Sequence, residues 1–223
     1  MAGSYGAEST RGERYRLSFT VGGLLASQGR ALAEMYLDHV GCSNAGCSSQ
    51  TEVGKSIAAI RQQAIEENVL AIRTDSANRR VVAETTKRLS ALTVRELAYL
   101  AGPDSSISDR EALMWIAMCR YYAIVGEFAG EVLKKHYLVG NLHLDFEDYA
   151  RFIADKATWH SELETISEGT AKKLRSNLFK AMAEAHLFDK IPTRWFLYQS
   201  FFGDILMKRP DSSGFFLMRE SSL

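Results

Sequence analysis

Basic side chains follow the expected start of two helices in the same order. The first stretch, "SANRR", spans 76–80, and the second, "TAKKLR", spans 170–175. Each begins with a hydroxyl residue suited to cap a helix, continues with Ala, and then places amide or basic side chains in succession. The free N–H groups and the positive dipole of a helix start attract phosphate. The chemistry that these stretches favour is therefore the binding of a nucleic acid.

Each stretch also follows another expected helix and a short bridge, which is a helix-turn-helix arrangement. In such a unit the second helix presents its N-terminal residues to the major groove of DNA. Arg and Asn can read base edges there, while Lys, Ser and Thr more often hold phosphates. The candidate DNA-binding residues are Arg73, Ser76, Asn78, Arg79, Arg80, Lys87, Arg88, Thr170, Lys172, Lys173, Arg175 and Ser176.

The competing interpretation of the first stretch is an ordinary solvated helix face. Glu84 lies four residues from both Arg80 and Arg88, and such pairs stabilise a helix by about 0.2–0.5 kcal/mol each without any ligand. A helical wheel places Arg80 and Lys87 opposite the apolar stripe, with Arg79 and Arg88 flanking those two, so all four are expected on the surface. Basic groups at a helix start oppose the dipole, which favours a binding role. The residues alone leave the two interpretations evenly balanced.

Signatures of catalysis are absent from the sequence. It contains no Walker-type glycine loop, no GxGxxG after a strand and no HExxH, and its five histidines are scattered. Cys42 and Cys47 lie close together without a second Cys or His pair, which is too few ligands for a zinc site. We therefore expect a protein that is not an enzyme and uses no metal or cofactor.

The composition bounds the class of protein. The chain has 223 residues, 46% of them hydrophobic and 24% charged, with a formal net charge of +0. A neutral chain cannot be coated in basic residues, so any nucleic-acid contact must be a local patch. The most apolar stretch, "ALMWIAMCRYYAIVGEFAGEVL", is interrupted by Arg120 and Glu127 before it is long enough to span a bilayer. The sequence has no apolar signal segment, and we expect a cytoplasmic monomer without a membrane contact.

Helical periodicity dominates the chain and predicts an all-α fold, a compact multi-helix globular bundle of about nine helices with two helix-turn-helix-like units. The expected helices lie at 21–40 after a Thr20 cap, 52–68, 76–92, 93–102, 109–137, from about 145, at 161–167, at 171–188, and from 193 onward. Capping boxes at Thr93–Glu96 and Ser108–Glu111 mark two of the starts, and Ser76 and Thr170 are expected to cap the two basic helices. The expected inward stripes are Val53, Ile57, Ile60, Ala64 and Ile65, then Val81, Val82, Thr85, Leu89 and Leu92, and finally Leu174, Leu178, Ala181, Met182 and Ala185.

Loop composition divides the chain into four expected regions. A flexible N-terminal tail covers 1–14, and a helical part with the first helix-turn-helix unit covers 15–140. A second helical part with the other unit covers 141–208, and a loose C-terminus covers 209–223. Gly140 and Asn141 mark the central break, although nothing there has the composition of a flexible linker.

Four segments together resemble the BrxA family, a small core component of BREX (bacteriophage exclusion) systems. They are "YRLSFTVGGLL" at 15–25, "EENVLAIRTDSANRRVVAETTKRLSAL" at 66–92, "WIAMCRYYAIVGEFAGEVL" at 115–133 and "KATWHSELETISEGTAKKLRSNLFKAMAEAHL" at 156–187. The resemblance covers roughly 15–205. It implies an all-helical protein with two helix-turn-helix units that binds double-stranded DNA beside the other BREX components.

The sequence therefore predicts a non-enzymatic, double-stranded DNA-binding accessory protein of a BREX phage-defence system. Two alternatives remain open. In the first, the basic helix starts dock acidic patches of a BREX partner, and the protein is a protein–protein adaptor. In the second, it is an RNA-binding helical bundle of the antitermination-factor type.

Overall fold

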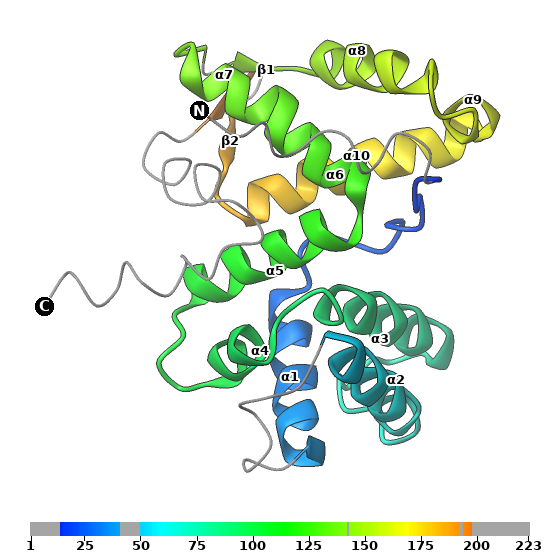
Figure 1. Cartoon of the computed structure of the whole chain (residues 1–223), viewed down its shortest axis with the longest axis vertical. Helices are drawn as coiled ribbons and strands as arrows, with labels where there is room; N and C mark the ends of the chain where they lie inside the picture. The colour runs from blue at the N-terminus through cyan, green and yellow to red at the C-terminus, as the bar shows by residue number, and fades with distance from the viewer. Residues whose placement is uncertain (1–13, 41–49, 142, 192–193, 198–223) are drawn as a thin grey trace, which may run out of the picture.

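A computed structural model describes residues 14–40, 50–141, 143–191 and 194–197, and it confirms the all-α class (Figure 1). The helices are α1 (Ala26–Val40), α2 (Gln50–Glu66), α3 (Asp75–Leu89), α4 (Val94–Ala101), α5 (Ile107–Tyr121), α6 (Ala123–Phe128), the π-helical turn η2 (Ala129–Leu133), α7 (Lys134–Leu138), α8 (Phe146–Ala157), α9 (Glu162–Thr165) and α10 (Glu168–Glu184). The predicted tail up to residue 13, the loop with Cys42 and Cys47, and the predicted loose end at 209–223 lie outside the described residues.

The fold also contains a small antiparallel sheet. Its strands are β1 (His143–Leu144), β2 (Phe188–Ile191) and β3 (Arg194–Leu197), and β3 lies between the other two. The helix expected from residue 193 is therefore wrong at 194–197. Aromatic and branched residues suit a strand as well as a helix, and here β1, about fifty residues earlier in the chain, supplies a pairing edge that no local pattern reveals.

The long helix expected at 109–137 is broken into α5, α6, η2 and α7. Tyr122 ends α5 with an extended backbone (φ −108°, ψ 95°), and α6 begins at the next residue. At Gly126 a Cβ atom would lie 2.7 Å from the carbonyl oxygen of Cys119, so the close approach across the break requires glycine. Hydrophobic periodicity continues through the break and hides it from the sequence.

A helix starts at the predicted residue only where the sequence contains a single suitable capping residue. The Thr93–Glu96 box of α4 is confirmed, because Thr93 and Glu96 bond each other's backbone N–H groups. The predicted start of a helix near 145 is also confirmed, and there the Asp145 carboxylate accepts from the first turn of α8. In α5 the box is Ser106–Asp109 rather than the expected pair two residues later, since the sequence offers the same pattern twice.

The two basic helices also begin earlier than expected. Thr74 is the N-cap residue of α3, and Ser167 caps α10 by accepting a hydrogen bond from the Thr170 N–H at 3.3 Å. Ser76 and Thr170 are therefore first-turn residues and not caps. The reason is that each helix begins on an acidic residue, which the positive dipole end favours.

Helix α1 begins later than expected, at Ala26 rather than after Thr20. Residues before it form an extended segment, and both Gly23 (φ +33°) and Leu25 (φ 60°) have left-handed backbone angles that interrupt a helix. This extended segment crosses between α3 and α10 in Figure 1, where it is the blue trace that leads into α1.

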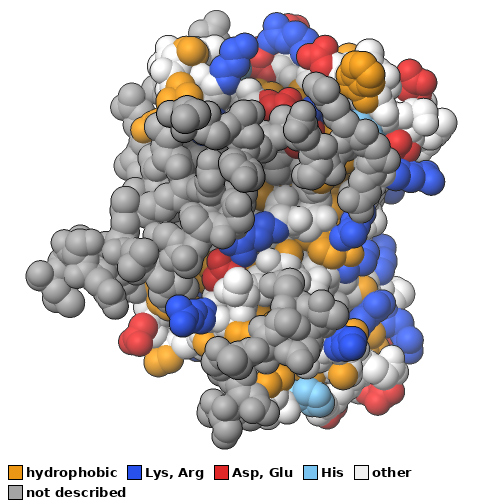
Figure 2. Space-filling model, viewed as in Figure 1, with side chains coloured by type: hydrophobic (Ala, Val, Ile, Leu, Met, Phe, Trp, Pro, Cys, Tyr) orange, Lys and Arg blue, Asp and Glu red, His pale blue; other side chains and the backbone are white. Residues whose placement is uncertain are grey.

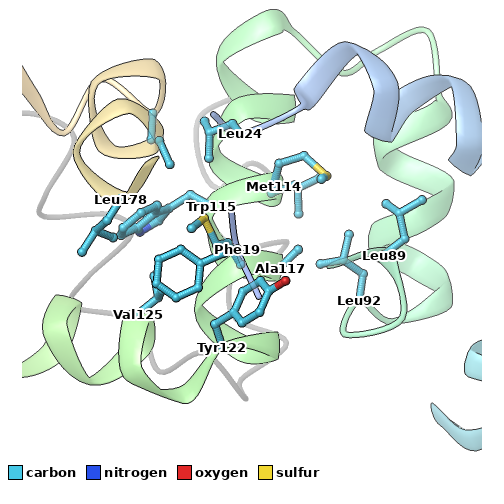
Figure 3. Packing of buried hydrophobic residues seen from close by; sticks show 14 of the residues in the cluster. Phe19, Leu24, Leu89, Leu92, Met114, Trp115, Ala117, Tyr122, Val125 and Leu178 are labelled. Carbon is cyan, nitrogen blue, oxygen red and sulfur yellow. The ribbon is translucent and has the colours of Figure 1, made fainter. Parts of the chain in front are cut away.

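One hydrophobic core runs through the described chain, from Tyr15 to Leu187. The predicted stripe of α10 is buried, as are Val53, Ile57, Ile60 and Ala64 of α2 and Val82, Thr85, Leu89 and Leu92 of α3, whereas Ile65 and Val81 are only partly buried. Figure 3 shows Phe19, Trp115 and Leu178 gathered in one part of this core and Leu89 with Leu92 in another. The division of the chain at 140 stays a prediction. No helix in the described ranges combines the length and apolar character that a membrane crossing requires.

Candidate nucleic-acid interface

The N-terminal half of α3 presents an exposed basic surface. Arg73, Arg79 and Arg80 are exposed, as is Ser76, and the Arg80 Nε donates to the Ser76 carbonyl oxygen at 3.2 Å. The bridge before the helix is held by Asn68, whose side chain bonds both backbone groups of Ile72. Figure 2 shows Lys and Arg side chains gathered over α3. These residues lie where the sequence predicts a contact with nucleic acid.

Asn78 is a correction to the predicted contact set. Its side chain is buried, with 3% of the residue exposed, and its Nδ2 donates to the carbonyl oxygen of Ile65 at 3.1 Å. Ile65 lies in the last turn of α2, whose carbonyls have no partner inside the helix. Asn78 therefore fastens α3 to α2 and cannot read a base in this conformation.

Arg88 is the second correction, since the structure places it in the core with 0% of the residue exposed. Its Nε lies 3.1 Å from the Glu84 Oε1, and its Nη1 donates to the carbonyl oxygens of Gly23 at 2.7 Å and Leu24 at 3.0 Å. The helical wheel failed here because the extended segment before α1 covers this part of α3. A side chain enclosed in this way has no path to a duplex.

Glu84 also points inward, which changes the charge balance of α3. It is 2% exposed, and it accepts hydrogen bonds from the Tyr122 hydroxyl at 2.8 Å as well as from Arg88. Burial first, and then the adjacent Glu84 carboxylate, raise the pKa of Tyr122, so the phenol stays protonated and donates. The expected surface pair between Arg80 and Glu84 is replaced by this buried one.

Lys87 lies at the edge between core and solvent. About a third of its side chain is exposed (35%), its Nζ donates to the Ser18 hydroxyl at 3.3 Å, and it lies 3.9 Å from the Glu84 carboxylate. Because Arg88 already pairs with that carboxylate at 3.0 Å, the charge of Lys87 is only weakly offset. It remains a candidate contact.

The predicted contact residues of α10 also include both exposed and partly buried side chains. Lys172, Lys173 and Ser176 are exposed, whereas Thr170 and Arg175 are partly buried. The Arg175 guanidinium lies 4.5 Å from the centre of the Phe146 ring, so much of its side chain covers that ring. The helix before α10 is the single turn α9. In Figure 1, α3 and α10 both begin toward the same side of the view.

The extended segment before α1 is the part of this surface that sequence reasoning missed. Along it, Tyr15 and Phe19 are buried and Leu17 is partly buried, while Arg16 and Ser18 are exposed. This alternation is the period-two pattern of an extended chain, and it is the sequence pattern that could have identified the segment. The six letters "YRLSFT" are too short to separate a strand-like segment from a loop.

Other polar clusters lie away from α3. A cavity of about 620 Å³ beside α7 and α8 is lined by Lys135, His136, Asp148 and Arg151 among others. Burial tends to raise the pKa of Asp148, but the Asp145 N–H, Arg151 and His136 outweigh burial and lower it. Within the described ranges, no group of three or more His, Cys, Asp or Glu side chains is placed to hold a metal ion. The prediction that the protein is not an enzyme is untested by this geometry.

The fold and this surface define an all-α protein that carries exposed cations near the start of two of its helices. A model of the family described as BrxA matches residues 13–196, and the chain belongs to the BrxA family. Two relatives carry the name "BREX protein BrxA". The one from Escherichia coli O9:H4 (strain HS) is 26% identical over 135 residues, which are 58% of this chain and 60% of that protein. The one from Bacillus cereus (strain H3081.97) is 22% identical over 129 residues, which are 56% of this chain and 62% of that protein.

These alignments span less than two thirds of either relative. The fold has a solved counterpart, the crystal structure of an uncharacterized protein from Magnetospirillum magneticum. It is 15% identical, with a TM-score of 0.63, and the match covers 82% of this chain and 85% of that one. At this identity the likeness shows the fold alone.

Proposed function

We propose that this protein is a non-enzymatic component of a BREX phage-defence system and that it binds double-stranded DNA. The BREX assignment rests on family membership and on the names of the two relatives. In this proposal α2 with α3, and α9 with α10, act as two helix-turn-helix units. The protein works in the cytoplasm beside other BREX components, as a monomer.

One observation carries the DNA-binding proposal, namely the inward position of Glu84. The competing interpretation needed Glu84 to neutralise Arg80 at the surface, but the carboxylate is buried between Tyr122 and Arg88. Arg79 and Arg80 are exposed, and neither forms an ion pair within the part of the chain that the structure describes. Asp75 in the first turn offsets part of this positive charge. The two exposed arginines still raise the potential near the positive helix end, and a phosphate backbone lowers it.

The revised contact set follows from exposure. The main proposed contacts are the exposed residues Arg73, Ser76, Arg79, Arg80, Lys172, Lys173 and Ser176. The partly exposed residues Lys87, Thr170 and Arg175 are secondary contacts. Contacts of this kind position a protein on the backbone without reading sequence. We therefore expect affinity for a random duplex that falls steeply with salt, with log K sloping by about −0.9 per phosphate neutralised.

The test is a salt titration of binding to a random DNA duplex, followed by fluorescence anisotropy. Arg79→Gln with Arg80→Gln should weaken binding and reduce the slope by about 1.8, since two phosphate contacts are lost. The matched control is Arg95→Gln with Lys135→Gln, which removes two exposed cations from α4 and α7 and should leave the slope unchanged. Circular dichroism should be native for both variants.

Two outcomes would overturn the proposal. If the wild-type protein does not bind the duplex even at low salt, an adaptor role is favoured instead. If an RNA of equal length displaces the duplex at lower concentration, the RNA-binding alternative is favoured.

A further inference from the structure

The extended segment at 14–24 is fastened to the body of the protein at both ends. The Tyr15 N–H donates to Glu162 of α9 at 2.7 Å, and the Leu24 N–H donates to Glu184 of α10 at 2.5 Å. Between them, Asn177 of α10 donates to the carbonyl oxygen of Phe19 at 3.1 Å. Irregular backbone is normally among the mobile parts of a fold. Here its position is fixed by side chains from two helices.

The α3 side of the segment is held just as firmly. The buried Arg88 donates to the carbonyls of Gly23 and Leu24. The Ser18 hydroxyl lies 3.4 Å from the Tyr122 hydroxyl and accepts from the Lys87 Nζ. The segment therefore bridges α10 and α3, and these bonds fix its backbone and the Ser18 hydroxyl in place without a ligand. Preorganised groups lose less conformational entropy on binding.

The outward charges on this bridge are positive. Arg16 is exposed, and its guanidinium lies 4.9 Å from the centre of the Tyr121 ring, which braces it without neutralising it. The Lys87 Nζ donates to Ser18 and lies 3.9 Å from the Glu84 carboxylate, whose charge Arg88 already offsets at 3.0 Å. Arg16 and Lys87 thus leave two positive charges beside a surface hydroxyl. Figure 2 shows Lys and Arg side chains along this flank of the molecule.

The Tyr15 end of the segment is different, because carboxylates surround it. Glu162 accepts from the Tyr15 N–H, and Glu127 accepts from its hydroxyl at 2.7 Å. Arg14 is also exposed, but it lies beside this acidic neighbourhood. A phosphate is therefore favoured near Arg16 and disfavoured near Arg14.

We propose that Arg16, the Ser18 hydroxyl and Lys87 form a third contact for the phosphate backbone of duplex DNA, on the bridge between the two helix units. This inference rests on the proposed function and deepens it. A duplex that touches the starts of both α3 and α10 must cross the segment that joins them (Figure 1). Arg16 adds a contact that lies outside either helix-turn-helix unit.

The test compares Arg16→Met with Arg14→Met in a salt titration on a random duplex. Methionine keeps the apolar cover over Tyr121 but removes the charge. Arg16→Met should reduce the slope of log K by about 0.9, so the ratio of wild-type to variant affinity should fall about 3.5-fold between 50 and 200 mM salt. Arg14→Met should leave the slope unchanged, and Arg16→Lys should restore most of it.

The outcomes separate this contact from the proposed function. If the wild-type protein binds and the α3 variant loses slope, but Arg16→Met titrates as wild type, the third contact is wrong and the function stands. Equal slope losses for Arg14→Met and Arg16→Met would also overturn it, because general charge then suffices. If the wild type does not bind DNA at all, both proposals fail. Should Arg16→Met not fold, Arg16→Gln decides the matter, with the same slope loss expected and a wild-type slope overturning the contact.

Discussion

Replacement of Arg88 by methionine should destabilise the protein severely, because this side chain donates to three buried acceptor groups at once. Its guanidinium lies 3.0–3.1 Å from the Glu84 carboxylate and 2.7–3.0 Å from the carbonyls of Gly23 and Leu24. Methionine fills most of the volume but leaves a buried carboxylate supported mainly by Tyr122. Breaking a buried pair on one side costs about 3–5 kcal/mol. Against a total stability of about 5–15 kcal/mol, that loss is a large fraction.

The measurement is urea unfolding monitored by circular dichroism, with Arg80→Met as the matched control. Arg80 is exposed and, among the residues that the structure describes, donates only to the Ser76 carbonyl. Its replacement should therefore change the unfolding free energy by less than about 0.5 kcal/mol. Adding Glu84→Gln to Arg88→Met should recover part of the loss, since the unpaired charge is then removed as well. A loss below about 1 kcal/mol for Arg88→Met, with weakened DNA binding, would refute the buried assignment and restore the surface role that the sequence predicted.

Two further predictions concern α6 and α8. Gly126→Ala should lower the unfolding free energy by about 1–3 kcal/mol in the same urea assay, because its Cβ would lie 2.7 Å from the Cys119 carbonyl oxygen. The control is Gly130→Ala, whose Cβ would have no atom within 4 Å, and it should change the unfolding free energy by less than about 1 kcal/mol. The lowered pKa of Asp148 means that its carboxylate contributes stability above the ordinary value of 3.8, and that this contribution is lost as the pH falls below it. Urea unfolding between pH 3 and 6 should therefore show a shallower acid loss for Asp148→Asn than for the wild type, and parallel curves would contradict this.

Local patterns were sufficient for most of the helices and for their buried faces. The α10 stripe is buried as expected, and the α4 box forms because Thr93 and Glu96 lie within one turn of each other. In both cases the information is contained within a few residues, so periodicity and capping rules reach it. Where two caps compete, as at Ser106 and Ser108, the same rules find the helix but not its first residue.

The candidate site was less accessible, because its decisive contacts join residues far apart in the chain. Arg88 and the carbonyl of Gly23 are 65 residues apart, and Glu84 and Tyr122 are 38 apart. A helical wheel assumes that the face opposite the apolar stripe meets solvent, and it has no means of placing an extended segment over that face. The strand β3 escaped prediction for a related reason, since its pairing edge comes from β1.

The two halves of α3 consequently differ in function, although basic residues occur in both halves of its sequence. In the C-terminal half, Glu84 and Arg88 form an ion pair with each other. Glu84 also accepts from Tyr122, and Arg88 also donates to the extended segment before α1. In the N-terminal half, Arg79 and Arg80 are exposed, and Arg80 lacks the Glu84 partner that its spacing suggested. The inward position of Glu84 therefore anchors the helix and leaves Arg80 without that carboxylate. Binding and stability should separate along this helix, with Arg79 and Arg80 affecting salt-dependent affinity and Arg88 affecting unfolding.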